Sequence, residues 1–273
     1  LMATPLTVCL VVLGKHVPGL EFVGMLMADT PALAPEYGYY QRLLARDQSE
    51  AADLIERHVK TEAPRSVYDA LLLPALNYAE RDRLEQRLSL DEETALIDAT
   101  RELLSDAAES IRRLEPEPSP SDDPALPGPR EPLRVLGFGT NGSADELALE
   151  MLGHLLDDLP IVVEVTKGRV LASELVSLVQ AQGVSVICLA DLPPSPPSKT
   201  RYLVKRLHAA LPNLRILVGR WGPEAPADDS TQLLRDAGAT LVASTLAETR
   251  TYLGGLVEIP RIPLPGTSSV QAA

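Results

Sequence analysis

The chain has 273 residues, of which 45% are hydrophobic, so it is long enough for two modest domains with ordinary apolar cores. Its 38 acidic and 25 basic side chains give a formal net charge of -13, which disfavours contact with nucleic-acid phosphates. Cys9 and Cys188 lie far apart in apolar runs, which argues against a disulfide framework or a paired-cysteine metal site.

The first segment, residues 1–28, opens on an apolar run that carries no charge before Lys15. The run is shorter than the roughly 20 residues that cross a bilayer, and the basic residues follow it, unlike those of a signal peptide. It fits either a buried strand or the end of a membrane helix. Because the chain starts with leucine, we interpret it as a fragment that begins with the end of a last transmembrane helix and a juxtamembrane connector.

Residues 29–114 show the periodicity of amphipathic helices, with apolar faces at 40–44, 51–59 and 67–78. Pro74 must kink or restart the third of these helices. Ser89 and Glu92 have capping-box spacing ahead of a fourth helix. Four such helices with short joints predict a small four-helix bundle.

A proline-rich stretch, residues 115–132, predicts an extended linker, and the tail at 258–273 is expected to be irregular. Between them, residues 133–257 alternate β-prone and helical runs. Strands are expected at 133–137, 161–165, 184–189, 214–218 and 240–243, and helices near 143–156, 171–182, 198–211, 230–237 and 246–256. This alternation predicts an α/β fold with a five-stranded parallel sheet in the flavodoxin-like order.

The glycines of the first strand-to-helix turn, Gly137, Gly139 and Gly142, match the spacing of a dinucleotide-binding fingerprint. Against that interpretation, Ser143 and Glu146 have capping-box spacing, which predicts a helix start at Ser143 with carboxylates in its first turn that repel a pyrophosphate. A flexible turn that reverses the chain is the alternative. Glu164 lies near the distance expected for a ribose contact, but inside a predicted strand.

Other types of site have little support in the sequence. The four histidines, His16, His58, His154 and His208, fall on separate predicted elements, so no metal site is expected, and no serine nucleophile motif is present. Arg201, Lys205 and His208 share one helical face, which is either a solvated surface or a docking site for a partner.

Ligands of open parallel sheets bind beyond the carboxyl ends of the strands. The candidate ligand-binding residues at that edge are Gly139, Thr140, Asn141, Gly142, Asp191, Gly219, Arg220, Trp221, Ser244 and Thr245. We expect no catalytic residues.

Two resemblances extend these expectations. Residues 3–22, ATPLTVCLVVLGKHVPGLEF, and 31–47, PALAPEYGYYQRLLARD, resemble the end of the last membrane helix and the cytoplasmic extension of autoinducer-2 exporter (PerM-like) permeases. That family consists of multi-span inner-membrane proteins implicated in the export of signalling molecules or ions.

The remainder is similar in architecture to cobalamin-binding modules, in which a four-helix cap precedes a flavodoxin-like domain. Residues 68–82 resemble the proline-kinked cap helix, and 146–152 resemble the helix after the first strand. The Asp-x-His-x-x-Gly motif of the family is replaced by Ser143, Asp145 and Ala148, so the axial histidine is missing. The cap has Glu93 and Thr94 where many such modules have Glu-His, and Gly219 is followed by Arg220 where a second glycine receives the nucleotide tail. We therefore expect no cofactor.

The resulting prediction is a cytoplasmic regulatory or sensor region of an inner-membrane permease, which contacts the membrane through its first segment. It takes an unidentified small ligand or none, does not bind nucleic acid, and forms a possible homo-oligomer. A soluble cobalamin-binding-like sensor is the alternative, and a dinucleotide-binding enzyme is the third interpretation.

Overall fold

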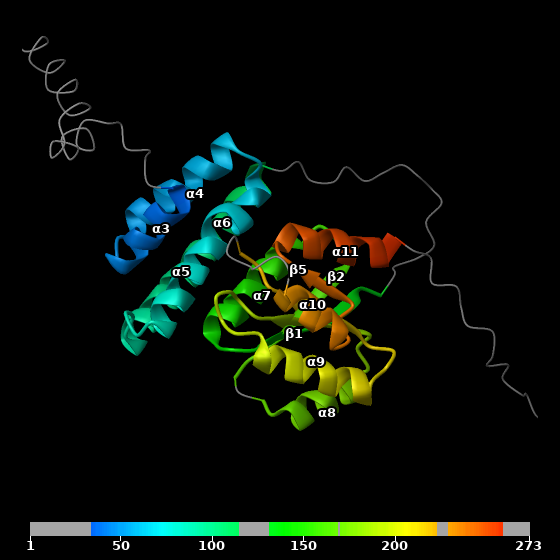
Figure 1. Ribbon diagram of the computed structural model, residues 1–273. Coiled ribbons are helices and arrows are strands. Elements are labelled where there is room, and N and C mark those ends of the chain that lie inside the picture. Colours follow the sequence, from blue (N-terminus) through cyan, green and yellow to red (C-terminus); the bar gives the residue numbers. More distant parts are fainter. Residues whose placement is uncertain (1–33, 115–130, 169, 223–228, 259–273) are drawn as a thin grey trace, which may run out of the picture.

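The computed structural model describes residues 34–114, 131–168, 170–222 and 229–258 of the chain. The predicted membrane segment at 1–28 lies outside the described residues, as do positions 115–130 of the predicted linker and 259–273 of the tail. Within the described part, none of the helices combines the length and the apolar character that crossing a bilayer requires. Figure 1 shows a helical bundle beside an α/β domain.

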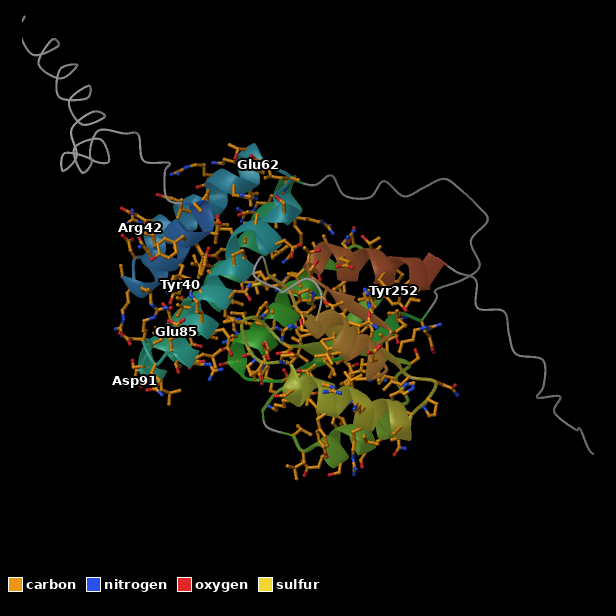
Figure 2. All side chains as sticks on the ribbon, in the orientation of Figure 1. Tyr40, Arg42, Glu62, Glu85, Asp91 and Tyr252 are labelled. Carbon is orange, nitrogen blue, oxygen red and sulfur yellow. The ribbon has the colours of Figure 1, made fainter. Side chains whose placement is uncertain are left out.

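The bundle contains α3 (Pro35–Leu44), α4 (Gln48–Thr61), α5 (Leu73–Leu84) and α6 (Leu90–Leu114), with a 3₁₀ turn η1 (Pro64–Ser66) and a π-helical turn η2 (Tyr68–Leu72) leading into α5. The predicted four-helix bundle is confirmed. Tyr40, labelled in Figure 2, lies where α3 packs on α5, and its hydroxyl donates to the Asp82 carboxylate over 2.7 Å.

Two local predictions in the bundle are also confirmed. The Glu92 carboxylate accepts from the Ser89 backbone N–H over 2.9 Å and the Ser89 hydroxyl accepts from the Glu92 N–H over 3.3 Å, which is the expected capping box. Pro74 lies in the first turn of α5, directly after η2. Proline lacks the N–H that an ordinary helix donates at this position, and the chain reaches it through the π-helical turn, in which the Leu73 N–H donates to the Tyr68 carbonyl.

The described residues of the second part form a five-stranded parallel sheet in the order β2-β1-β3-β4-β5. Its strands are β1 (Leu133–Gly139), β2 (Ile161–Thr166), β3 (Val186–Ala190), β4 (Arg215–Gly219) and β5 (Leu241–Ala243), and its helices are α7 (Ser143–Leu155), α8 (Ala172–Gln182), α9 (Ser198–Ala210), α10 (Asp229–Asp236) and α11 (Leu246–Glu258). This is the flavodoxin-like order that the strand and helix alternation predicts.

The side chains of the strands alternate between two cores. Val186 and Cys188 of β3 face the core shared with α7, α11 and the bundle, whereas Ile187 and Leu189 face the core under α8, α9 and α10. Period-two alternation of this kind is what a strand buried on both faces requires. The bundle therefore packs on one side only of the α/β domain, against α7 and α11 (Figure 1).

The first two glycines of the fingerprint serve this packing. A Cβ on Gly137 would lie 3.3 Å from the Leu149 methyl carbons, and a Cβ on Gly139 would lie 3.0 Å from the Asp145 Cβ and 3.1 Å from the Glu146 nitrogen. Both residues let α7 approach β1 closely, which explains the glycine spacing without a nucleotide.

Polar contacts fix the bundle to the α/β domain at one end of α11. The carboxylate of Asp69 in η2 accepts from the backbone N–H groups of Leu246 and Ala247, over 2.7 and 2.9 Å, and so caps α11 from another part of the chain. Nearby, Asp158 accepts from Arg65 of the bundle over 2.6 Å and from Arg250 of α11 over 2.6 and 2.7 Å. The two arginines hold the pKa of Asp158 well below its usual range, so this contact is an ion pair at neutral pH.

Candidate functional site

A buried polar network lies at the carboxyl edge of the sheet, around Asp191. This residue directly follows β3 and is fully buried. One of its carboxylate oxygens accepts from the Asn141 side-chain amide over 2.9 Å, and the other accepts from the Arg220 guanidinium over 2.9 Å. The same Arg220 nitrogen donates to the Ser195 carbonyl over 2.9 Å. The edge therefore joins loops that follow β1, β3 and β4.

Asp145 occupies the centre of this network from the first turn of α7. Its carboxylate accepts from the backbone N–H groups of Asn141 and Leu192, over 2.7 and 3.0 Å, and it is 2% exposed. Burial raises the pKa of Asp145 to about 7, against the lowering effect of the two N–H groups, and the carboxylates of Asp191 and Glu80 add to the rise. The carboxyl is thus enclosed and changes charge near neutral pH.

Glu80 of α5 extends the network into the bundle. It is 5% exposed, accepts from the Ser195 hydroxyl, and pairs with Arg83 over 2.5 and 2.8 Å. Arg83 also lies 3.8 Å from Glu93 of α6. Hydrogen bonds therefore run without a break from the bundle, through Ser195, to the Arg220–Asp191 pair.

Lys199 connects the loop after β1 to the first turn of α9. Its ammonium donates to the Thr140 carbonyl, and the hydroxyls of Thr200 and Thr140 lie 3.2 Å apart. Thr140 and Thr200 are buried. A cation and two hydroxyls thus hold this loop against α9.

Trp221, which follows β4, fills the space beside Gly219. A Cβ on Gly219 would lie 2.2 Å from the indole ring, and the indole N–H donates to the Thr249 hydroxyl of α11 over 2.9 Å. Gly222 is in turn in close contact with the buried side chain of Asn77 from α5, whose Oδ1 has no partner among the described residues. The sequence predicted Trp221 as a candidate ligand-binding residue at this edge, and here it is a fully buried core residue.

The structure brings only part of the predicted edge together. Thr140, Asn141, Asp191 and Arg220 meet in one network. Gly219 and Trp221 lie on the face of the sheet toward α11. The remaining predicted residues are placed elsewhere and have other roles: Gly139 packs against α7, Gly142 is the N-cap of α7, and Ser244 and Thr245 bond Glu248 at the start of α11.

The predicted capping box of α7 is wrong, although the helix does start at Ser143. Glu146 reaches instead to the backbone N–H of Gly168 over 3.0 Å, because Gly142 is the N-cap and carries no side chain. The ribose contact suggested for Glu164 is also unsupported, since this residue pairs with Arg134 through two bonds of 2.9 Å. Glu164 and the first two glycines of the fingerprint, which were the support for the dinucleotide interpretation, thus have other structural roles.

The described histidines lie away from this edge. His58 bonds the Ser66 hydroxyl over 2.9 Å, His154 lies 3.7 Å from Asp157, and His208 packs under Gly238. Over residues 34–114, 131–168, 170–222 and 229–258, no group of three or more histidine, cysteine, aspartate or glutamate side chains has the geometry of a metal site. Burial raises the pKa of the Cys188 thiol to about 12, so it is an inert core residue.

Comparison with known proteins gives a partial answer. No family model and no curated protein matches the chain. Among solved structures, it is similar to a cobalamin-binding protein from Desulfitobacterium hafniense DCB-2, with 11% identity, a TM-score of 0.38, and coverage of 79% of this chain and 95% of the other. It is also similar to the methanol:cobalamin methyltransferase complex MtaBC from Methanosarcina barkeri, with 15% identity, a TM-score of 0.33, and coverage of 90% and 91%.

These findings correct one prediction and leave another without support. Both similar structures are described as proteins of cobalamin chemistry, which contradicts the prediction of no cofactor, and that prediction is withdrawn. The comparisons give no support to the permease resemblance.

Sequence reasoning missed several residues of the network. Asp145 was noted as a charge that would repel an anion and as the replacement of the axial histidine, whereas its burial makes it the centre of the edge. Ser195 follows Asp191 closely in the sequence, so its place in the loop after β3 could have suggested it. Glu80 gives no such signal, because in the sequence it resembles any other acidic residue of an amphipathic helix.

Proposed function

We propose that the chain is a ligand-sensing module of the cobalamin-binding type, in which the bundle reports on the carboxyl edge of the sheet. The observation that carries this proposal is the hydrogen bond between Ser195 and Glu80, which links the bundle to the Asp191–Arg220 pair. Ligands of parallel sheets bind at this edge, and buried charges are costly unless they are paired. A ligand that changes this pairing therefore changes the contact of the bundle. The proposal includes no catalytic step.

The described residues do not fit a corrinoid held through an axial histidine. Asp145 stands at the position of that histidine, and both of its oxygens are already engaged by backbone N–H groups. A carboxylate is also a harder donor than imidazole. The space beside Gly219, where the resemblance would place the nucleotide tail, is filled by Trp221. We therefore do not propose Asp145 as a ligand of cobalt. The proposed binding surface is the carboxyl edge of the sheet as a whole.

The proposed mechanism is a shift between two arrangements of the bundle. In the arrangement described here, Arg220 is held by Asp191 and by the Ser195 carbonyl, and the Ser195 hydroxyl is held by Glu80. A ligand that competes for Arg220 or Asn141 loosens the loop that carries Ser195. The Glu80 contact is then lost, and α5 moves away from the edge.

Equilibrium dialysis of the full chain against hydroxocobalamin tests the ligand class. We expect retention of about one cobalamin per chain, with a visible spectrum that keeps the form of the free cofactor, because the three described histidines lie away from this edge. The Glu80→Gln variant should bind cobalamin more tightly, because it weakens the arrangement in which Glu80 holds Ser195, and this arrangement competes with the ligand. If Glu80→Gln destabilises that arrangement by about 1.4 kcal/mol, the affinity for cobalamin rises roughly tenfold.

Glu102→Gln is the matched control, since Glu102 is an exposed acid of α6 that lies in the bundle but outside the network. It should leave cobalamin affinity unchanged. No retention at about 0.1 mM cobalamin, a concentration that detects binding of about -5 kcal/mol, would overturn the corrinoid as the ligand class. Retention with equal affinity in Glu80→Gln and the unaltered chain would overturn the role of Glu80.

Attachment to an inner-membrane permease stays a prediction. It rests on residues 3–47, of which only 34–47 are described, and these begin the bundle. The sequence encoded upstream tests it, because a permease requires several further apolar spans of about 20 residues each.

A further inference from the structure

Helix α9 carries an exposed basic surface on an acidic protein. Arg201, Lys205 and Arg206 are exposed, α9 contains no acidic residue, and none of the three makes an ion pair with any described residue. Tyr202 lies among them and is 57% exposed. We call these four residues the basic α9 face. An exposed aromatic ring surrounded by unpaired cations has the composition of a protein-binding hot spot.

A groove of complementary character lies between α4 and α6. It is a cavity of about 160 Å³ whose floor is apolar, formed by Ala52, Ile55, Leu103 and Ala107. Asp53, Glu56 and Asp106 stand at its rim. Glu56 pairs with Lys60, whereas Asp53 and Asp106 are exposed and have no ion pair within the described part of the chain. We call this the acidic α4–α6 groove.

The two surfaces cannot meet within one molecule. The basic α9 face belongs to the helices on the side of the sheet away from the bundle, whereas the acidic groove is on the bundle (Figure 1). The basic α9 face of one molecule can therefore contact the acidic α4–α6 groove of another molecule, but not its own. The net charge of -13 repels a second copy at long range, but at physiological salt that repulsion is screened beyond about 8 Å, so the local contacts decide.

We propose that copies of this chain associate head to tail, with the basic α9 face of one copy docked in the acidic α4–α6 groove of the next. Tyr202 enters the apolar groove, and Arg201, Lys205 and Arg206 face Asp53 and Asp106. Such a contact joins two different surfaces, so it extends into short chains of molecules unless the rotation between copies closes a ring. The contact is small and strongly charged, which places it among weak, salt-sensitive interfaces.

Sedimentation equilibrium of the full chain tests this proposal. At about 0.1 M salt, below physiological ionic strength, we expect the weight-average mass to rise above the 29.4 kDa of one chain as concentration approaches about 0.5 mM, and to return to it at about 1 M salt. Tyr202→Ala should weaken association at least about tenfold, the scale of one lost aromatic anchor.

Charge reversal tests the pairing itself. The double variants Lys205→Glu/Arg206→Glu and Asp53→Lys/Asp106→Lys should each fail to associate alone, and an equimolar mixture of the two should associate again. Arg87→Glu/Lys167→Glu is the charge-matched control for Lys205→Glu/Arg206→Glu, because it makes the same change in net charge at residues elsewhere that are 56% and 73% exposed. It should associate like the unaltered chain. A mass of one chain at every concentration, or a mixture that fails to recover, would overturn the proposal.

Discussion

Gly219, the last residue of β4, has no side chain, and this leaves room for the ring of Trp221. The indole of Trp221 lies so close that a Cβ would meet it at 2.2 Å, and Trp221 is fully buried. Gly219→Ala must therefore displace the ring, and we expect a loss of about 1–3 kcal/mol in the free energy of unfolding, the usual cost of overpacking a core. Urea unfolding followed by the fluorescence of Trp221, the one tryptophan of the chain, measures this loss.

Gly153→Ala is the matched control for that substitution. Gly153 lies inside α7, and a Cβ there has open space within 4 Å. Because alanine is the better helix former, this variant should gain about 0.5–1 kcal/mol. A similar loss in both variants would show that the Trp221 contact is not the cause.

The residues around Asp191 also show what the sequence could predict at this scale. Thr140, Asn141, Asp191 and Arg220 meet at one edge, because parallel strands bring their carboxyl ends together, and their role in binding a ligand stays a prediction. The same rule could not distinguish Ser244 and Thr245, which cap α11 instead. Side-chain hydrogen bonds depend on geometry that strand order alone does not specify.

Helix α11 has a second cap, supplied by the bundle, in addition to its local cap at Thr245. Asp69 of the bundle accepts from the N–H groups of Leu246 and Ala247, and burial raises the pKa of Asp69 while these two N–H groups lower it. We expect Asp69→Ala to destabilise the protein by about 1–2 kcal/mol, the cost of an N-cap aspartate. Amide hydrogen exchange should be faster at the start of α11 in particular.

Asp98→Ala is the control for this cap, since Asp98 is an exposed acid of α6 that pairs with Arg101 over 3.2 Å. An exposed ion pair of this kind contributes at most about 1 kcal/mol, so exchange at α11 should be unchanged. Equal exchange at α11 in Asp69→Ala and the unaltered chain would contradict the role of Asp69 as its cap.

Element boundaries were predictable wherever the signal is local. The period of apolar residues located the five strands, and the Ser89–Glu92 spacing located the start of α6. The contact of Asp69 with the start of α11 was not predictable, because Asp69 and Leu246 are 177 residues apart in the chain. The use of Glu146 was missed for a related reason, since its partner is the Gly168 backbone 22 residues away.

At the scale of the whole molecule, one of the two cores extends from the α/β domain into the bundle. Tyr39 and Leu76 of the bundle belong to the same buried cluster as Leu149 of α7 and Leu253 of α11. The sequence predicted a bundle and a flavodoxin-like sheet, but no pattern in it indicated which face of the sheet the bundle covers. That choice is made by contacts such as Arg65 with Asp158, which join residues 93 positions apart.

A shared core implies that the bundle and the α/β domain unfold together. Far-UV circular dichroism, to which the bundle helices contribute strongly, and the fluorescence of Trp221 in the α/β domain should therefore give the same urea midpoint. Arg65→Ala should lower both midpoints by the same amount, because it removes a half-buried contact to Asp158 and to the Leu155 carbonyl between the two parts. Lys60→Ala, which removes an exposed ion pair with Glu56 within α4, should leave both midpoints nearly unchanged. Two separate transitions in the unaltered chain would contradict a shared core, and the bundle would then be an independent unit that only rests on the sheet.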